Sequence, residues 1–215
     1  QDLQKEYRRQ RQMCIRDSPS WNVGVDYTTQ LAHSADRDEV IALYQQAGLN
    51  LTQDMAALET APRITADPQA VAYLNKYITL NGVLNIPVLT MHTTGDGIEV
   101  NQNEQAYASV VHSSGDTSLL RQVFVHRAGH CTFTPAETLT AFQTLIHRLD
   151  SGQWDDSTNP DLMNQEATAF GPNLNVLCTA GGINGSCSTL TPTPPAFFRF
   201  EPTLFLRPFP SHGLQ

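Results

Sequence analysis

The chain has 215 residues, which is enough for one domain or for a large part of one. Only 16% of its residues are charged and its formal net charge is −8, so it offers few cations to nucleic acid or to an anionic membrane surface. No apolar stretch approaches the roughly 20 residues that a membrane-spanning helix needs. Composition therefore argues against nucleic acid as a partner and against a membrane span.

The first 18 residues differ in character from the rest of the chain. They are polar and basic, and they lack the apolar core of a secretory signal. The run from Arg9 to Ser18 resembles translated sequencing-adapter text, of the kind found at the ends of some metagenomic reading frames. The alternative is a solvated basic arm. On either interpretation residues 1–18 take no part in the fold, and on the first the natural N-terminal part of the protein has been lost.

Residues 19–84 are predicted to be mostly helical. Asp36 and Glu39 have the spacing of a capping box, an apolar stripe follows, and Gly48 ends the pattern. Thr52 is expected to begin a short second helix. Asp67 followed by Pro68 begins another helix. Such a segment fits a lid over an active site or an ordinary helical subdomain, and the sequence leaves both open.

Residues 85–155 alternate between strand and helix patterns. The short apolar run 86–91 predicts a buried parallel strand, 100–111 a helix, and 119–125 a second strand. Thr134, Pro135 and Glu137 then supply the cap, first-turn proline and third-position acid of a further helix. Its expected buried face consists of Leu139, Phe142, Leu145, Ile146 and Leu149. This alternation predicts an α/β fold with a parallel sheet.

Residues 156–215 are predicted to form an extended, proline-rich tail with one short helix near 162–170. The stretch 196–209 fits a surface tail or an edge strand. Cys178 and Cys187 flank a glycine-rich loop, and a disulfide closing such a loop is typical of a secreted protein. Two free thiols are the alternative.

Two polar residues follow the predicted strands. Asp96 comes shortly after the first strand, and His130 shortly after the second. Open α/β sheets place their sites at the carboxyl ends of parallel strands. A histidine serves as a base near neutral pH, and a carboxylate can hold it in the required tautomer. The sequence therefore predicts an Asp96–His130 catalytic pair, with Glu99 as the second choice for the acid.

Other candidates near the pair carry weaker signals. His126, His130 and Cys131 could be read as metal ligands, but an i, i+4 pair needs a helix and Gly129 indicates a turn. No metal and no cofactor is therefore expected. Cys131 could act as a nucleophile beside a base. Because adjacent loop residues usually point apart, we expect a small buried side chain instead. His92 is expected in the core or behind the site.

From Trp21 to about Asp155 the chain resembles the C-terminal half of secreted actinobacterial-type α/β-hydrolases. The resemblance is carried by residues 86–96 (IPVLTMHTTGD) and 127–134 (RAGHCTFT), and the stretch 195–209 is also similar. It implies an eight-stranded, mostly parallel sheet of which this chain holds the last two strands with flanking helices, after a helical, lid-like segment. It also implies that Asp96 is the triad acid and His130 the base. The chain departs from the family by lacking a G-x-S-x-G nucleophile turn.

The resemblance implies a serine hydrolase that acts on carboxylic esters. The chain would be a C-terminal fragment that is inactive alone. Its expected partners are a small-molecule ester and the N-terminal half of the same protein. An aminopeptidase-like hydrolase and a non-catalytic binding protein on the same scaffold are the alternatives.

Overall fold

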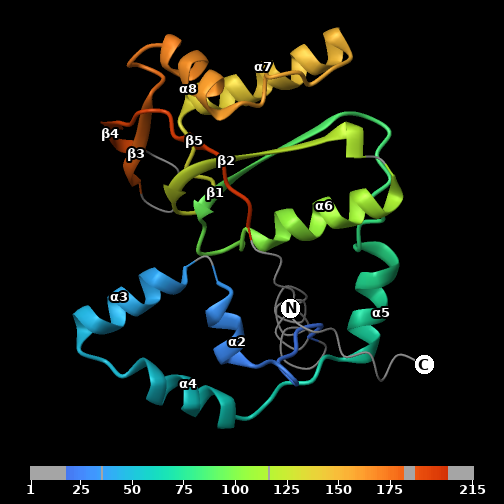
Figure 1. The fold of residues 1–215 in the computed structure, drawn as a ribbon, viewed down its shortest axis with the longest axis vertical. Helices are drawn as coiled ribbons and strands as arrows, with labels where there is room; N and C mark the ends of the chain where they lie inside the picture. Colours follow the sequence, from blue (N-terminus) through green and yellow to red (C-terminus); the bar gives the residue numbers. More distant parts are fainter. Residues whose placement is uncertain (1–17, 35, 116, 182–186, 203–215) are drawn as a thin grey trace, which may run out of the picture. The chain divides into compact units, whose positions relative to one another are not determined.

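The computed structural model describes residues 18–34, 36–115, 117–181 and 187–202. The chain divides into two compact units (Figure 1). The helical unit holds the described residues up to Leu80, and the sheet unit holds the described residues from Asn81 to Pro202. The division falls at residue 80, four positions before the boundary expected at residue 84. The expected N-terminal arm lies, except for Ser18, outside the described residues.

The helical unit contains α2 (Tyr27–Ala32), α3 (Arg37–Ala47), α4 (Leu51–Thr60) and α5 (Pro68–Tyr77). The start of α5 is confirmed, because the Asp67 carboxylate accepts hydrogen bonds from the backbone amides of Gln69 and Ala70. The capping box predicted at Asp36 is wrong. Asp36 has ψ 7° instead of the extended conformation of a typical cap, and its side chain makes no capping hydrogen bond. Helix α4 is capped by Asn50, two residues before the predicted start.

The sheet unit contains the remaining elements. They are β1 (Val88–Gly95), α6 (Gln102–Ser114), the 3-10 turn η1 (Thr117–Leu119), β2 (Leu120–Ala128), α7 (Pro135–Ser151), α8 (Pro160–Ala169), β3 (Val176–Gly181), β4 (Cys187–Pro192) and β5 (Phe197–Phe198). One sheet has the order β1-β2-β5, and β3 and β4 form a separate hairpin. Strands β1 and β2 are parallel, whereas β5 is antiparallel to β2. The chain thus has the α/β architecture that was predicted, with a mixed sheet.

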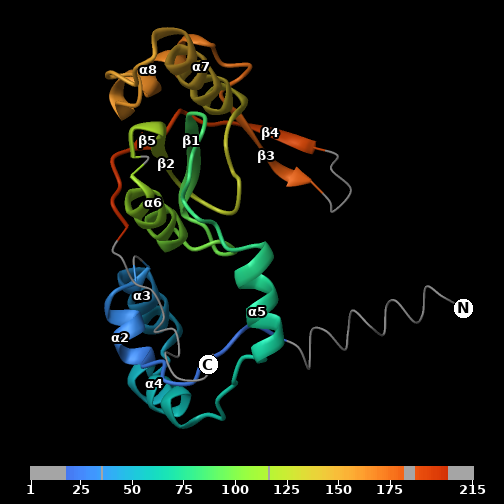
Figure 2. The ribbon, with the colours of Figure 1, turned by 90° about the vertical axis from the view of Figure 1, so that its right-hand side faces the viewer.

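The three-stranded sheet lies between two helical layers (Figures 1 and 2). Helix α6 covers one face, and α7 and α8 cover the other. The core lies between β2 and the α7–α8 layer. It consists of Val123, Val125, Ala136, Ala141, Met163, Ala167 and Phe197.

Both parallel strands are longer than the sequence pattern indicated. The pairing of β1 with β2 continues through His92↔Phe124 and Thr93↔Val125 to Gly95↔Ala128. The polar residues that follow Met91, where the predicted strand ended, are thus still strand residues. The backbone pairing extends beyond the apolar residues from which the strand was recognised. Asp96 therefore follows the last residue of β1 directly.

Helix α7 begins as predicted but buries a different face. Thr134 and Glu137 form both hydrogen bonds of a capping box, Pro135 occupies the first turn, and Gly152 ends the helix in the left-handed conformation. The predicted buried face is wrong, since Leu139, Phe142, Ile146 and Leu149 are exposed. The buried residues are instead Ala136, Glu137, Thr140, Ala141 and Thr144. Small side chains let α7 approach the sheet closely, so the larger apolar side chains face outward.

The described part of the tail contains more regular structure than expected. The short helix predicted near 162–170 is confirmed as α8, and β5 pairs with β2, which is the edge-strand alternative for 196–209. The β3–β4 hairpin was not predicted. Cys178 is disulfide-bonded. The side chain of Cys187 lies outside the described residues, so the Cys178–Cys187 pairing stays a prediction. Within the described ranges, no helix is long and apolar enough to cross a membrane.

Candidate active site

The site is built where the two parallel strands end. Gly95 closes β1 beside Ala128 of β2, and a Cβ atom at Gly95 would lie 3.2 Å from the Ala128 Cα. The Gly129 backbone amide donates to the Gly95 carbonyl at 2.9 Å. Gly129 has φ +100°, a conformation that favours glycine. These two glycines bring the residues that follow β1 and β2 close together.

Two buried side chains fix this strand edge further. The hydroxyl of Thr93, which is 1% exposed, donates to the Gly129 carbonyl at 2.7 Å. The amide of Asn101, at the start of α6, donates to the Thr94 carbonyl at 2.7 Å. Sequence reasoning did not find either residue. A threonine in a strand and an asparagine near a helix start are both common, so neither gives a distinctive signal.

Asp96 and His130 are brought together as predicted. The His130 Nδ1–H donates to Asp96 Oδ2 at 2.8 Å. The second carboxylate oxygen, Oδ1, accepts the backbone amides of Ile98 at 2.8 Å and Glu99 at 3.0 Å. The Asp96 side chain is 3% exposed, whereas that of His130 is 42% exposed. The arrangement is a buried, oriented carboxylate that holds one nitrogen of an open imidazole ring.

The surroundings of Asp96 keep its carboxyl group ionised. Burial by itself raises the pKa of this group. The amide hydrogen bonds from Glu99 and Ile98 and the contact with His130 outweigh that effect, and the pKa falls from 3.8 to about 2. The carboxylate can thus accept from the imidazole over the whole neutral range. A neutral His130 bonded in this way carries its proton on Nδ1 and presents Nε2 as a free base.

Cys131 lies on the other side of the ring. Its Sγ is 3.5 Å from His130 Nε2, and the side chain is exposed. The prediction of a small buried side chain is therefore wrong. Cys131 has φ +52°, outside the helical and extended regions, and this conformation turns its side chain towards that of the preceding residue. An unusual backbone angle of this kind is not visible in the sequence.

The other candidate residues have different surroundings. Glu99 donates its backbone amide to Asp96 while its carboxylate accepts from Asn103, so Asp96 is the acid in contact with His130. His92 is partly buried, with Nδ1 2.8 Å from the Thr93 carbonyl. His126 is exposed, and its ring packs on Phe198. Among the described residues, no cluster of three or more His, Cys, Asp or Glu side chains is arranged to hold a metal ion.

Comparison with known proteins gives one informative similarity. The chain is similar to a protein named o-phthalyl amidase from Xanthobacter agilis, with 35% identity over 153 residues. The similar region covers 70% of this chain but 34% of the relative, so the chain spans about a third of that protein's length. No family model matches the chain. No solved structure matches it either.

Proposed function

We propose that the chain supplies the acid and the base of a serine hydrolase that acts on carboxylic esters. The observation that carries the proposal is the 2.8 Å contact between buried Asp96 and open His130, at the shared carboxyl end of two parallel strands. The similarity to an amidase-named protein supports hydrolysis in general.

In the proposed reaction a serine hydroxyl attacks the ester carbonyl carbon. His130 Nε2 takes the hydroxyl proton as the serine oxygen bonds to carbon. The same nitrogen then gives that proton to the leaving alcohol, and the acyl group stays on the serine. In the second half of the reaction, Nε2 takes a proton from water as the water oxygen bonds to the acyl carbon. It then gives that proton to the serine oxygen as the bond between this oxygen and the acyl carbon breaks and the acid leaves. Asp96 keeps Nδ1 protonated throughout and stabilises the imidazolium that forms twice.

We propose that the serine comes from an N-terminal portion of the same polypeptide. The chain contains no G-x-S-x-G turn, and it spans about a third of the relative. Two surfaces of the sheet unit would receive such a portion. Strand β1 forms one end of the sheet order β1-β2-β5, and α7 exposes four large apolar side chains. A parallel strand beside β1 would place a following turn near His130.

Amide hydrolysis is the second candidate, and the name of the relative favours it. The same acid–base pair serves both reactions, because His130 would protonate a leaving amine instead of an alcohol. An aminopeptidase-like activity belongs to this candidate. A binding protein without catalysis requires that the longer gene also lack a nucleophile.

The test starts from the DNA upstream of residue 19. A reading frame that continues into strand patterns and a G-x-S-x-G turn supports the proposal, and the longer protein is then assayed with matched p-nitrophenyl esters, aminoacyl anilides and aryl amides. Faster turnover of the esters supports the first candidate, and faster turnover of the amides supports the second. A longer protein that has no nucleophile and hydrolyses none of these substrates would support the remaining alternative, a binding protein without catalytic activity.

We also propose that the protein is secreted, on the basis of the disulfide at Cys178. Mass spectrometry of peptides from the unreduced protein identifies the partner of Cys178. A partner other than Cys187 would remove the closed loop on which this proposal rests.

A further inference from the structure

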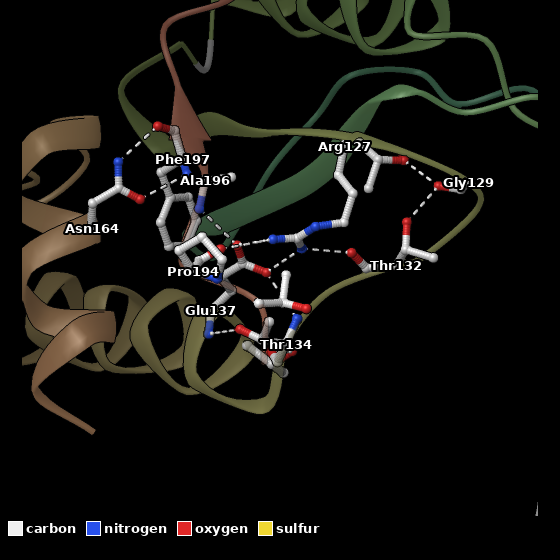
Figure 3. A network of polar contacts seen from close by, with 12 residues as sticks. Arg127, Gly129, Thr132, Thr134, Glu137, Asn164, Pro194, Ala196 and Phe197 are labelled. Carbon is white, nitrogen blue, oxygen red and sulfur yellow. Dashed lines mark hydrogen bonds and ion pairs between the residues drawn. The ribbon is translucent and has the colours of Figure 1, made fainter. Parts of the chain in front are cut away.

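We propose that Arg127, held in place by Glu137, is a positioning residue that sets the orientation of His130. This inference rests on the proposed function, since it concerns the residue assigned as the base. Neither residue touches the imidazole. Arg127 instead contacts Thr132, in the loop that carries His130 (Figure 3).

Arg127 joins the end of β2 to the loop that follows it. Its Nη1 donates to the Thr132 carbonyl at 2.8 Å and to Glu137 Oε2 at 2.6 Å. Its Nη2 donates to Glu137 Oε1 at 2.9 Å and to the Pro194 carbonyl at 3.1 Å. Thr132 lies two positions after His130. A planar guanidinium can make all of these contacts at once, which a single ammonium group cannot.

Glu137 fixes the guanidinium because it is itself held from several sides. Its carboxylate is fully buried, and it accepts the backbone amides of Thr134 at 2.8 Å and Ala196 at 2.9 Å. The first contact belongs to the cap of α7, and the second ties in the segment that leads to β5. That segment is anchored in turn, since the Asn164 side chain both donates to and accepts from the Phe197 backbone (Figure 3). A buried carboxylate with charge-assisted partners on each oxygen has one favourable position.

His130 therefore lies between two fixed points. On the strand side, Gly129 is bonded to Gly95 and Thr93. On the helix side, the Thr132 carbonyl is bonded to Arg127. Releasing the second point would leave the loop held on its strand side alone, by the contacts of Gly129 and by the Thr132 hydroxyl, which donates to the Ala128 carbonyl at 2.8 Å and to the Gly129 carbonyl at 3.0 Å. The imidazole would then sample orientations in which Nδ1 no longer reaches Asp96.

The test is nuclear magnetic resonance of the full-length protein with ¹⁵N-labelled histidine, comparing wild type with Arg127→Met and Arg127→Lys. The His130 ring signals are identified by their loss in His130→Ala. In wild type we expect a His130 Nδ1–H signal that is protected from exchange with water. We expect this signal to be lost in Arg127→Met. In Arg127→Lys, which keeps the positive charge but lacks the planar guanidinium group, we expect several-fold faster exchange of this proton with water. Arg63→Met is the matched control, because it removes an ion pair with Glu59 in the helical unit.

A folded Arg127→Met variant with the wild-type His130 signal overturns the proposal. If Arg127→Met fails to fold, Arg127→Lys decides, and unchanged exchange in that variant means that the ion pair only stabilises the fold. These outcomes concern ring orientation and need no substrate. Failure of the proposed function would appear separately, as hydrolysis by the longer protein that does not depend on His130.

Discussion

Among the residues described in the sheet unit, two aspartate–histidine pairs have nearly equal separations. His130 Nδ1 lies 2.8 Å from Asp96 at the strand ends, and His147 Nε2 lies 2.7 Å from Asp155 at the end of α7. The side chains of the second pair are about half exposed, at 48% and 47%, whereas the Asp96 side chain is 3% exposed. Two pairs at nearly the same distance can therefore differ widely in how deeply the carboxylate is buried.

The two pairs differ in what holds the carboxylate and in which nitrogen is left open. Asp96 accepts two backbone amides on one oxygen and the imidazole on the other, so that its orientation is fixed. Asp155 accepts the Ser157 amide but lies in solvent, where the attraction is screened. The His147 pair is thus a natural control for each experiment on the His130 pair.

Removing the imidazoles should separate the pairs most strongly. In the proposed longer hydrolase we expect His130→Ala to lower kcat by up to about 10⁶-fold, the loss seen when a serine protease loses its base. His147→Ala should leave kcat unchanged. Steady-state hydrolysis of a p-nitrophenyl ester measures both. Equal losses of kcat in His130→Ala and His147→Ala would contradict the assignment of His130, and not His147, as the base.

Removing the acids should give the next largest contrast. Asp96→Asn keeps the shape of the side chain but favours the wrong tautomer of His130, so we expect a loss of kcat on the order of 10⁴-fold. Asp155→Asn should have no effect on kcat. The same assay applies, with KM recorded to separate binding from chemistry. If Glu99→Gln abolished activity while Asp96→Asn stayed active, Glu99 would instead be the acid that orients His130.

Cys131 sharpens the comparison because its sulfur lies at the open nitrogen of the His130 ring. A bulky maleimide on this exposed thiol should fill the space in front of Nε2 and remove most of the activity of the longer protein. The Cys131→Ala variant should stay active and resist the reagent. Activity assays before and after treatment test this, with mass spectrometry to identify the labelled cysteine. If Cys131→Ala is itself inactive, the thiol takes part in the reaction.

The pH dependence of stability should give the smallest difference. The Asp96 pKa is lowered to about 2 from 3.8. A lowered pKa stabilises the folded state fully above the ordinary value, and this contribution is lost as the pH falls through the folded value. Melting temperatures should therefore fall less between pH 5 and pH 2 in Asp96→Asn than in wild type.

The Asp155 pKa is also lowered, first by His147 and then by the Ser157 amide. Asp155 therefore also stabilises the folded state above the ordinary pKa of an aspartate, but its pair with His147 is exposed, so solvent and salt screen the attraction. Asp155→Asn should therefore change the acid dependence less, and 0.5 M salt should abolish that change. An effect of Asp155→Asn as large as that of Asp96→Asn would contradict the contrast in burial.

Local signals in the sequence predicted much of this arrangement. The capping box and proline located the start of α7, and Gly129 marked the turn after β2 that brings His130 towards Asp96. These features depend on a few neighbouring residues. Side-chain type and spacing are therefore sufficient to predict them.

Features set by distant contacts could not be predicted in the same way. Periodicity identified an apolar stripe on α7, but only packing decides that the small residues around Ala136 and Ala141 face the sheet. The contact of Cys131 with His130 depends on one positive φ angle. Arg127 reaches Glu137 ten positions later and Pro194 in another segment, a pairing that no local pattern specifies.

The most direct test of the account is labelling of the longer protein with a fluorophosphonate, which reacts with serines activated by a neighbouring base. The account predicts that wild type and His147→Ala are labelled on a serine N-terminal to residue 19, whereas His130→Ala is not. Labelling that persists in His130→Ala would show that another base activates the serine, and the Asp96–His130 pair would not be the catalytic one.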